Sequence, residues 1–161
     1  MTLLVNLARV IWFRPCASGT RVGARSGKEM AKLANVLIVD DNPRCLEFMT
    51  LAFTAHGGVN VASELRSVNA VDRIRTEKPD IVVLDVKMPD VDGFAVLSLL
   101  RGEGNSVPVV MCSGSALQKD VDRAYASGCN GYIEKPTTLE DYRAMAAAVV
   151  EYWRRGELPL H

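Results

Sequence analysis

From residue 35 onward, the chain alternates between short runs of β-branched and aliphatic residues and longer amphipathic stretches. Each short run has the length and continuous apolar character of a strand that is covered on both faces. The longer stretches place apolar residues at helical spacing, as Leu46, Met49 and Phe53 do. The pattern predicts strands at 35–39, 59–62, 81–85, 107–113 and 131–134, and helices at 43–55, 65–74, 93–100, 117–126 and 138–155.

Five strands that alternate with five helices predict an α/β fold. Parallel strands joined by right-handed crossovers form an open, doubly wound sheet with helices on both faces. In such a sheet, ligands bind beyond the carboxyl ends of the strands, where the strand order reverses. The residues that follow each strand are therefore the first place to look for chemistry.

Composition narrows the class of protein. With 161 residues and 48% apolar residues, the chain can bury one core, so one domain is expected. Four cysteines without a C-x-x-C spacing indicate reduced thiols in a cytoplasmic protein, with neither a zinc site nor a disulfide framework. No stretch approaches the roughly 20 apolar residues that cross a bilayer, so no membrane partner is expected.

Charge is distributed unevenly along the chain. Residues 1–28 hold five basic and no acidic residues, whereas the other 133 residues hold 14 basic and 19 acidic ones. The acidic body argues against nucleic-acid binding. We interpret residues 1–29 as a disordered basic leader or a non-native extension, with a transit peptide as the alternative. A domain over 34–155 and a short tail over 156–161 complete the predicted organisation.

Polar residues stand at the predicted strand ends. Asp40 and Asp41 follow the first strand, Asp85 ends the third, Ser113 ends the fourth and Lys135 follows the fifth. At ~5 Å and an effective dielectric constant near 20, each pair of carboxylates costs roughly 3 kcal/mol, which one ammonium cannot offset for three. A hard divalent cation such as Mg²⁺ can. The set predicts phosphoryl transfer, with a carboxylate as the nucleophile.

Four motifs occur in order: VLIVDDNP, VVLDVKMPDVDG, VVMCSGSA and GYIEKP. With them, residues 34–155 resemble the CheY-like receiver domains of response regulators in two-component signalling systems. The resemblance implies a flavodoxin-like sheet of five parallel strands in the order 2-1-3-4-5. It also implies a stand-alone response regulator that accepts a phosphoryl group from a sensor histidine kinase or a phosphotransfer protein.

The resemblance assigns a role to each site residue. Asp85 is the implied phosphoacceptor, with Ser113 donating its hydroxyl and Lys135 its charge to the phosphoryl group. The implied Mg²⁺ ligands are Asp40, Asp41, Asp85 and the backbone carbonyl of Lys87. Tyr132 stands at the position of a switch aromatic that turns inward when Ser113 moves, and a cis peptide bond is expected before Pro136.

The resemblance also implies how the signal leaves the domain. A downstream protein is expected to bind the face made by the fourth helix, fifth strand and fifth helix. Tyr152 and Trp153 leave two interpretations open: a contact with a partner or a second copy in a homodimer, or packing of the last turn against the domain. The protein is expected not to be a classical enzyme, although it would catalyse its own phosphotransfer and dephosphorylation.

Two other functions stay open at this point. An aspartate-nucleophile phosphatase shares the carboxylates and the lysine, but such enzymes usually carry a second acid where this chain has Lys87. An interaction module that has lost phosphorylation is the other alternative. Taken alone, Asp40 and Asp41 also suit a helix N-cap, while Asp90, Asp92 and Gly93 suit a turn and are left out of the site.

Overall fold

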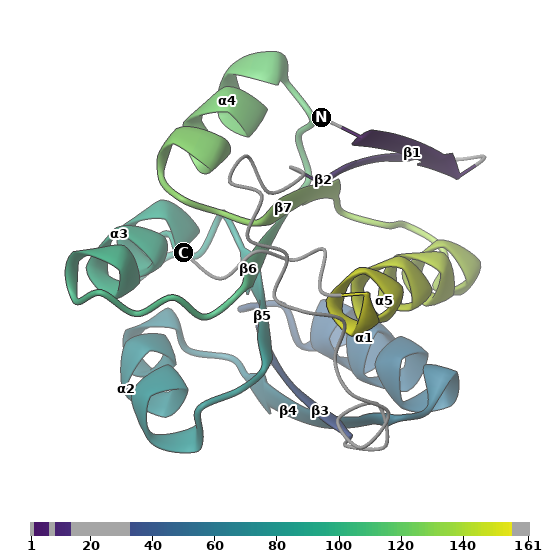
Figure 1. The fold of residues 1–161 in the computed structure, drawn as a ribbon, viewed down its shortest axis with the longest axis horizontal. Coiled ribbons are helices and arrows are strands. Elements are labelled where there is room, and N and C mark those ends of the chain that lie inside the picture. Colours follow the sequence, from purple (N-terminus) through teal and green to yellow (C-terminus); the bar gives the residue numbers. More distant parts are fainter. Residues whose placement is uncertain (1, 7–8, 14–32, 156–161) are drawn as a thin grey trace.

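The central sheet contains five parallel strands in the predicted order. The computed structural model describes residues 2–6, 9–13 and 33–155. The parallel strands are β3 (Ala34–Val39), β4 (Val59–Glu64), β5 (Ile81–Asp85), β6 (Val109–Ser113) and β7 (Gly131–Glu134). They lie in the order β4-β3-β5-β6-β7, which confirms the predicted 2-1-3-4-5 arrangement (Figure 1).

Helices cover both faces of this sheet. They are α1 (Pro43–His56), α2 (Ser67–Glu77), α3 (Gly93–Gly102), α4 (Gln118–Ala126) and α5 (Leu139–Arg154). The helices α1 and α5 lie on one face, and α2, α3 and α4 on the other (Figure 1). Alternate residues of one strand therefore enter different cores: Ile38 packs with Phe53 on the first face, and Leu37 with Leu97 on the second. Burial on both faces explains the continuous apolar runs.

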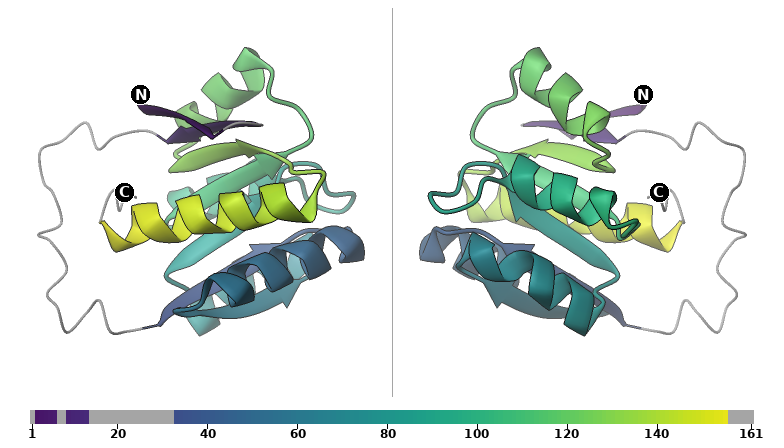
Figure 2. Two further views of the ribbon diagram at one scale, coloured as in Figure 1. Left: turned by 90° about the vertical axis from the view of Figure 1, so that its right-hand side faces the viewer. Right: turned by 90° about the vertical axis from the view of Figure 1, so that its left-hand side faces the viewer.

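Two further strands extend the sheet beyond β7. The strands β1 (Thr2–Asn6) and β2 (Arg9–Phe13) pair antiparallel, and β2 pairs antiparallel with β7, which gives a seven-stranded mixed sheet (Figure 2). Within residues 1–29, the interpretation as a disordered leader is therefore wrong at these two strands, while the non-native extension and the transit peptide stay untested predictions. Both segments are rich in aliphatic and β-branched residues and are two residues apart, which suits a hairpin. The rest of that prediction, and the tail at 156–161, lie outside the described residues.

The residue that caps the start of α1 is not one of the two acids that precede it. The helix N-cap is Asn42, whose Oδ1 accepts hydrogen bonds from the backbone N–H groups of Arg44 and Cys45 at 3.0 and 3.4 Å. Pro43 occupies the first turn, where no backbone donor is needed. Neither Asp40 nor Asp41 is the cap, so the alternative that both serve only as a helix N-cap is wrong.

The end of α5 resolves the two interpretations of Trp153. Its side chain is buried, with 3% of its surface exposed, and packs in the core cluster on the face of α1 and α5. Packing of the last turn against the domain is therefore confirmed. Within the described part of the chain, Cys45, Cys112 and Cys129 are free thiols. No helix among the described residues has both the length and the apolar character needed to span a bilayer.

Candidate functional site

Three carboxylates meet at the carboxyl ends of β3 and β5. Asp40 and Asp41 directly follow β3, and Asp85 is the last residue of β5. Because the two strands are parallel neighbours, one oxygen from each carboxylate lies within 4.8 Å of the others. Asp40 and Asp85 are buried, with 0% and 4% exposure, while Asp41 is exposed. The cluster is thus a buried pair of acids with an opening to solvent at Asp41.

Lys135 brings a positive charge to the cluster from β7. Its Nζ lies 2.7 Å from Oδ2 of Asp40 and 3.3 Å from Oδ1 of Asp85. The other oxygen of Asp40, Oδ1, accepts a hydrogen bond from the backbone N–H of Asn42 at 2.9 Å. Three ionised carboxylates and one ammonium leave a formal charge of minus two. The sequence prediction that these four side chains converge is confirmed.

The pKa of Asp85 reflects this crowding. Burial and the negative charges of Asp40 and Asp41, opposed by Lys135, together raise it from 3.8 to about 6, and burial is the largest of these effects. Burial acts on Lys135 in the opposite sense and lowers its pKa. The hydrogen bond from Lys135 to Asp40 and the charges of both acids outweigh that effect, so the pKa of Lys135 lies above its ordinary value. Asp85 is consequently held as a carboxylate at neutral pH, at an electrostatic cost.

The chemistry of the cluster fits Mg²⁺. The donors are carboxylate oxygens, which this hard cation prefers, and the formal charge of minus two that the three carboxylates and Lys135 have together balances that of one divalent ion. The exposed side of the cluster at Asp41 leaves room for water or phosphate oxygens, which Mg²⁺ retains in most protein sites. Asp40, Asp41 and Asp85 are the residues that would hold the ion. The carbonyl of Lys87 remains a predicted ligand.

Ser113 and Tyr132 are connected through the loop that follows β6. Ser113 is buried, and its Oγ accepts a hydrogen bond from the backbone N–H of Ser115 at 3.2 Å. Tyr132 is fully buried, and its hydroxyl donates to the backbone carbonyl of Ser115 at 2.7 Å. The aromatic side chain at the predicted switch position therefore occupies the inward position. The same loop is held to α4, because Oγ of Ser115 donates to Asp120 at 3.2 Å.

A cavity lies beside the loop that follows β5. Its volume is about 500 Å³, and Lys87, Met88, Phe94, Ser113 and Arg123 are among its lining residues. The guanidinium of Arg123 lies over the ring of Phe94, 4.0 Å from the ring centre. The cavity thus brings two cations, Lys87 and Arg123, and two acids, Asp92 and Asp120, around Ser113. The sequence pattern does not single out Arg123 or Phe94, because neither follows a strand.

Gly93 contributes to the site although the sequence interpretation leaves it in a turn. A Cβ atom at this position would lie 2.3 Å from the backbone carbonyl oxygen of Asp85. The Gly93 N–H also donates to the carbonyl of Val86 at 2.9 Å. The start of α3 therefore packs directly against the backbone of Asp85, and only glycine allows this approach. Asp92 is the N-cap of α3, which confirms its capping role.

The peptide bond before Pro136 differs from the expectation. No cis peptide bond occurs among the described residues, so the bond between Lys135 and Pro136 is trans. The trans isomer is the more stable one before most prolines. The prediction of a cis bond is therefore wrong, while the position of Lys135 in the cluster agrees with the prediction.

Sequence comparisons agree with this geometry. A family model described as the response regulator receiver domain matches residues 36–147. TcrX of Mycobacterium tuberculosis, named a probable transcriptional regulatory protein, is 33% identical over 106 residues, which are 66% of this chain and 45% of TcrX. FilR2 of Methanothrix harundinacea, named a probable methanogenesis regulatory protein, is 32% identical over 127 residues, which are 73% of this chain and 82% of FilR2. The chain thus spans less than half of TcrX.

Solved structures show the same fold. A CheY-like response regulator receiver domain protein from Methanospirillum hungatei superposes with a TM-score of 0.67 at 22% identity, covering 78% of this chain and 98% of that one. The chemotaxis protein CheY4 of Vibrio cholerae gives 0.65 at 22% identity, covering 73% and 98%. At these identities the likeness establishes the fold alone. The matched family model covers every residue of the carboxylate cluster and Lys135.

Proposed function

The chain belongs to the response regulator receiver domain family, and from this premise we propose that it is a Mg²⁺-dependent phosphorylation switch whose phosphoacceptor is Asp85. The observation that carries the proposal is the meeting of Asp40, Asp41, Asp85 and Lys135 in one partly open cluster. The family implies a histidine kinase or a phosphotransfer protein as the donor. We expect a protein of the cytoplasm that is not a classical enzyme.

Each side chain has a part in the proposed transfer. A carboxylate oxygen of Asp85 attacks the phosphorus of a phosphohistidine, the new O–P bond forms as the P–N bond breaks, and the imidazole leaves with its electron pair and takes a proton. The raised pKa of Asp85, near 6, leaves the nucleophile ionised at neutral pH. Bound Mg²⁺ would neutralise charge on the phosphoryl oxygens.

Lys135 and Ser113 then hold the phosphoryl group. The Lys135 ammonium, 3.3 Å from Asp85, is placed to pair with a phosphoryl oxygen. The Oγ of Ser113 accepts a hydrogen bond from the Ser115 N–H, and its own O–H can donate to another phosphoryl oxygen, so movement of Ser113 toward that oxygen would displace Ser115. Because Tyr132 is bonded to the same Ser115, we propose that this displacement is the Ser113/Tyr132 switch that alters the surface offered to a partner protein.

The output surface that we propose is the one around α4, β7 and α5, where β2 pairs with the outer edge of β7. Tyr132 in β7 is linked to the site through Ser115, so this surface is adjacent to the switch. The partner that we propose is a protein, since the chain outside residues 1–28 carries more acidic than basic residues. The burial of Trp153 removes one apolar residue from the contacts available at the end of α5.

Intact-mass measurement after incubation with acetyl phosphate and Mg²⁺ tests the proposal. One added phosphoryl group is expected on the parent chain and none on Asp85→Asn. Asp41→Asn should slow the transfer, because it removes the exposed carboxylate of the metal site. The matched control is Asp90→Asn, which changes an exposed carboxylate outside the cluster and should leave the transfer unchanged.

Two outcomes would contradict the proposal. Equal phosphorylation of the parent and Asp85→Asn would place the acceptor elsewhere. Steady release of phosphate from varied phosphomonoesters would favour the aspartate-nucleophile phosphatase instead. Omission of Mg²⁺ tests the requirement for the metal independently of which residue is the acceptor. Without the ion, the parent chain should remain unmodified over the same time.

A further inference from the structure

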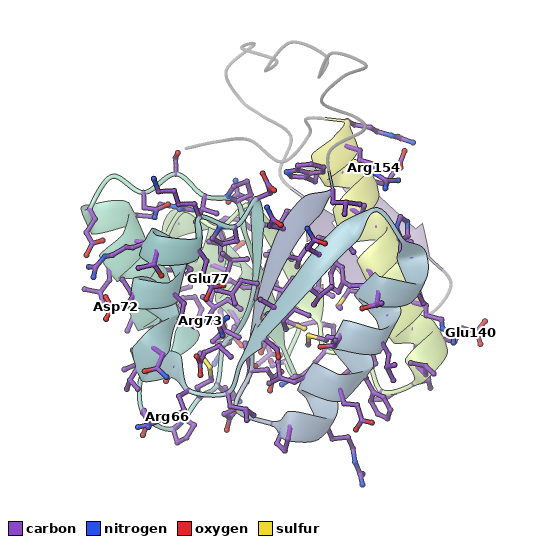
Figure 3. All side chains as sticks on the ribbon, turned by 90° about the horizontal axis from the view of Figure 1, so that it is seen from below. Arg66, Asp72, Arg73, Glu77, Glu140 and Arg154 are labelled. Atoms are coloured by element: carbon purple, nitrogen blue, oxygen red, sulfur yellow. The ribbon has the colours of Figure 1, made fainter. Side chains whose placement is uncertain are left out.

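The two outer edges of the parallel sheet are protected in different ways. An unpaired edge strand exposes backbone N–H and C=O groups that can pair with another chain. At the β4 edge, a side chain takes the place of a neighbouring strand: Nη1 of Arg73 donates a hydrogen bond to the carbonyl of Ser63 at 2.6 Å. The same atom lies 3.4 Å from a carboxylate oxygen of Glu64. Figure 3 labels Arg73 and Glu77, which form an ion pair at 2.6 Å on α2. At the β4 edge, the outward carbonyl of Ser63 is thus satisfied by a side chain of the domain itself.

The β7 edge is instead covered by a separate strand. The antiparallel register pairs Ile11 with Ile133, Trp12 with Tyr132 and Phe13 with Gly131. The hairpin of β1 and β2 lies before residue 36, where the match to the receiver domain family begins. It therefore adds to the family fold, and it pairs with the outer side of β7, which would otherwise lack a ladder partner as that of β4 does (Figure 2).

The covered strand is also the strand that reaches the carboxylate site. Tyr132, which lies opposite Trp12, donates its hydroxyl to the Ser115 carbonyl. Lys135 directly follows β7, and its backbone N–H donates to the carbonyl of Ser113 at 2.6 Å. A shift in the loop of residues 113–115 would therefore reach β7 at two points.

We propose that the β7 edge is a strand-docking surface, and that its occupant in this chain is the chain's own hairpin, residues 2–13, whose docking is coupled to the carboxylate site. The hairpin adds a strand to the sheet in cis, so it excludes any other extended segment from this edge. The docking is independent of the proposed function. The coupling rests on that function, and by linkage it is reciprocal: a site ligand that weakens docking is itself bound more weakly while the hairpin is docked.

Hydrogen exchange with mass spectrometry tests the docking in the full chain. The variants are Ile11→Pro and Trp12→Pro. Consecutive residues of a strand direct their N–H groups to opposite neighbours, so one of the two prolines removes a bond to β7 and the other a bond to β1. Exchange in the segment 131–134 should rise by about tenfold or more in at least one variant, because its edge-facing amides lose their acceptors. Segment 81–85 in the sheet centre is the internal control.

Three results would overturn the docking. Unchanged exchange at 131–134 in both variants would show that the hairpin does not protect β7. Loss of protection at both 131–134 and 81–85 would show that the hairpin is part of the folding core and not a separable ligand. A mass that rises with protein concentration in light scattering, and that the prolines abolish, would show that the hairpin binds a second copy.

A second measurement tests the coupling. Exchange at residues 2–13 and 131–134 is compared before and after treatment with acetyl phosphate and Mg²⁺, with Asp85→Asn as the control. A several-fold change is expected in the parent and none in the variant. If intact mass shows the added phosphoryl group but exchange does not change, the coupling is wrong and the proposed function stands. If no phosphoryl group is added, the proposed function fails, and the coupling that rests on it fails too, while the docking result stands.

Discussion

The carboxyl ends and the amino ends of the parallel strands surround their charged side chains with different kinds of groups. At the carboxyl ends, three carboxylates of like charge surround one ammonium. At the amino ends of β6 and β7, one guanidinium, that of Arg101, donates to four neutral oxygens. These are the carbonyls of Asn105, Gly128 and Val107 at 2.7, 3.0 and 3.0 Å, and Oδ1 of Asn130 at 3.1 Å.

The two charged groups differ in whether their neighbours balance them, and this indicates a structural role for Arg101 and a binding role for the cluster around Asp85. Burial lowers the pKa of Arg101, as burial raises that of Asp85, so both charges carry a cost of desolvation. Around Arg101, oriented carbonyl dipoles replace the lost water, and the group needs no further partner. Around Asp85, the nearest groups include two other carboxylates, and the excess negative charge remains. The end of the sheet with unbalanced charge is the end at which we propose that a cation and a phosphoryl group bind.

Arg101→Ala is expected to have the largest effect on stability. It leaves four part-buried oxygens without this charged donor, so the free energy of unfolding should fall by about 2–3 kcal/mol. Urea unfolding measures the change. The control is Arg75→Ala, which breaks ion pairs of exposed side chains with Asp72 and Glu103 and should destabilise the fold much less, because water screens exposed pairs. Equal losses in both variants would mean that the Arg101 hydrogen bonds do not stabilise the amino end.

Asp85→Asn should have an intermediate effect of the opposite sign. The pKa of Asp85 is about 6 in the folded chain against 3.8 when unperturbed, so the folded state binds more protons between these pH values. Stability therefore falls as pH rises through this window, by up to about 3 kcal/mol, and stays low above it. The neutral Asn removes this loss, and without Mg²⁺ the variant should be about 2 kcal/mol more stable at pH 7.

Unfolding measured from pH 4 to 8 checks this second prediction. The parent should lose stability across the window, and Asp85→Asn should lose much less. Asp90→Asn, which changes an exposed carboxylate, should retain the pH dependence of the parent. A variant that is less stable than the parent at pH 7 would mean that the carboxylate of Asp85 stabilises the apo site, contrary to the crowding described above.

Lys87→Ala should have the smallest effect on stability and a clear effect on the site. Lys87 is exposed at the cavity beside the loop that follows β5, so its removal should change the free energy of unfolding by less than about 0.5 kcal/mol. Its loss opens the approach of water to the phosphoryl group on Asp85, and we expect a several-fold shorter lifetime of that group. Intact mass followed over time measures the decay, and an unchanged lifetime would exclude this role.

Much of the fold follows from local patterns. The runs at 81–85 and 131–134 coincide with β5 and β7, and the helix expected at 43–55 differs from α1 by one residue. Strands buried on both faces and amphipathic helices leave patterns with different periods, so both can be recognised without a structure. The strand expected at 107–113 begins later, at Val109. The carbonyl of Val107 accepts a hydrogen bond from Arg101, so Val107 belongs to the preceding turn. The first bond to β5 is the one that the carbonyl of Pro108 accepts from the N–H of Val82.

Other features leave no such local pattern. The approach of Gly93 to the Asp85 carbonyl depends on how α3 packs against the end of β5, so the glycine resembles any turn residue in the sequence. The hairpin at residues 2–13 is composed of good strand formers, but its place in the sheet depends on the outer edge of β7, far along the chain. The burial of Tyr132 likewise depends on α4 and on the loop that follows Ser113.

The sequence by itself determined that acids, a hydroxyl and a lysine stand at successive strand ends, because strand length and residue type are local properties. Only the tertiary structure decided which of these groups are close enough to repel or pair. That outcome depends on distances of 2.7 and 3.3 Å from Lys135 to two acids, and on the water that burial removes around them. Electrostatic energy varies with separation and solvation, and the folded chain sets both.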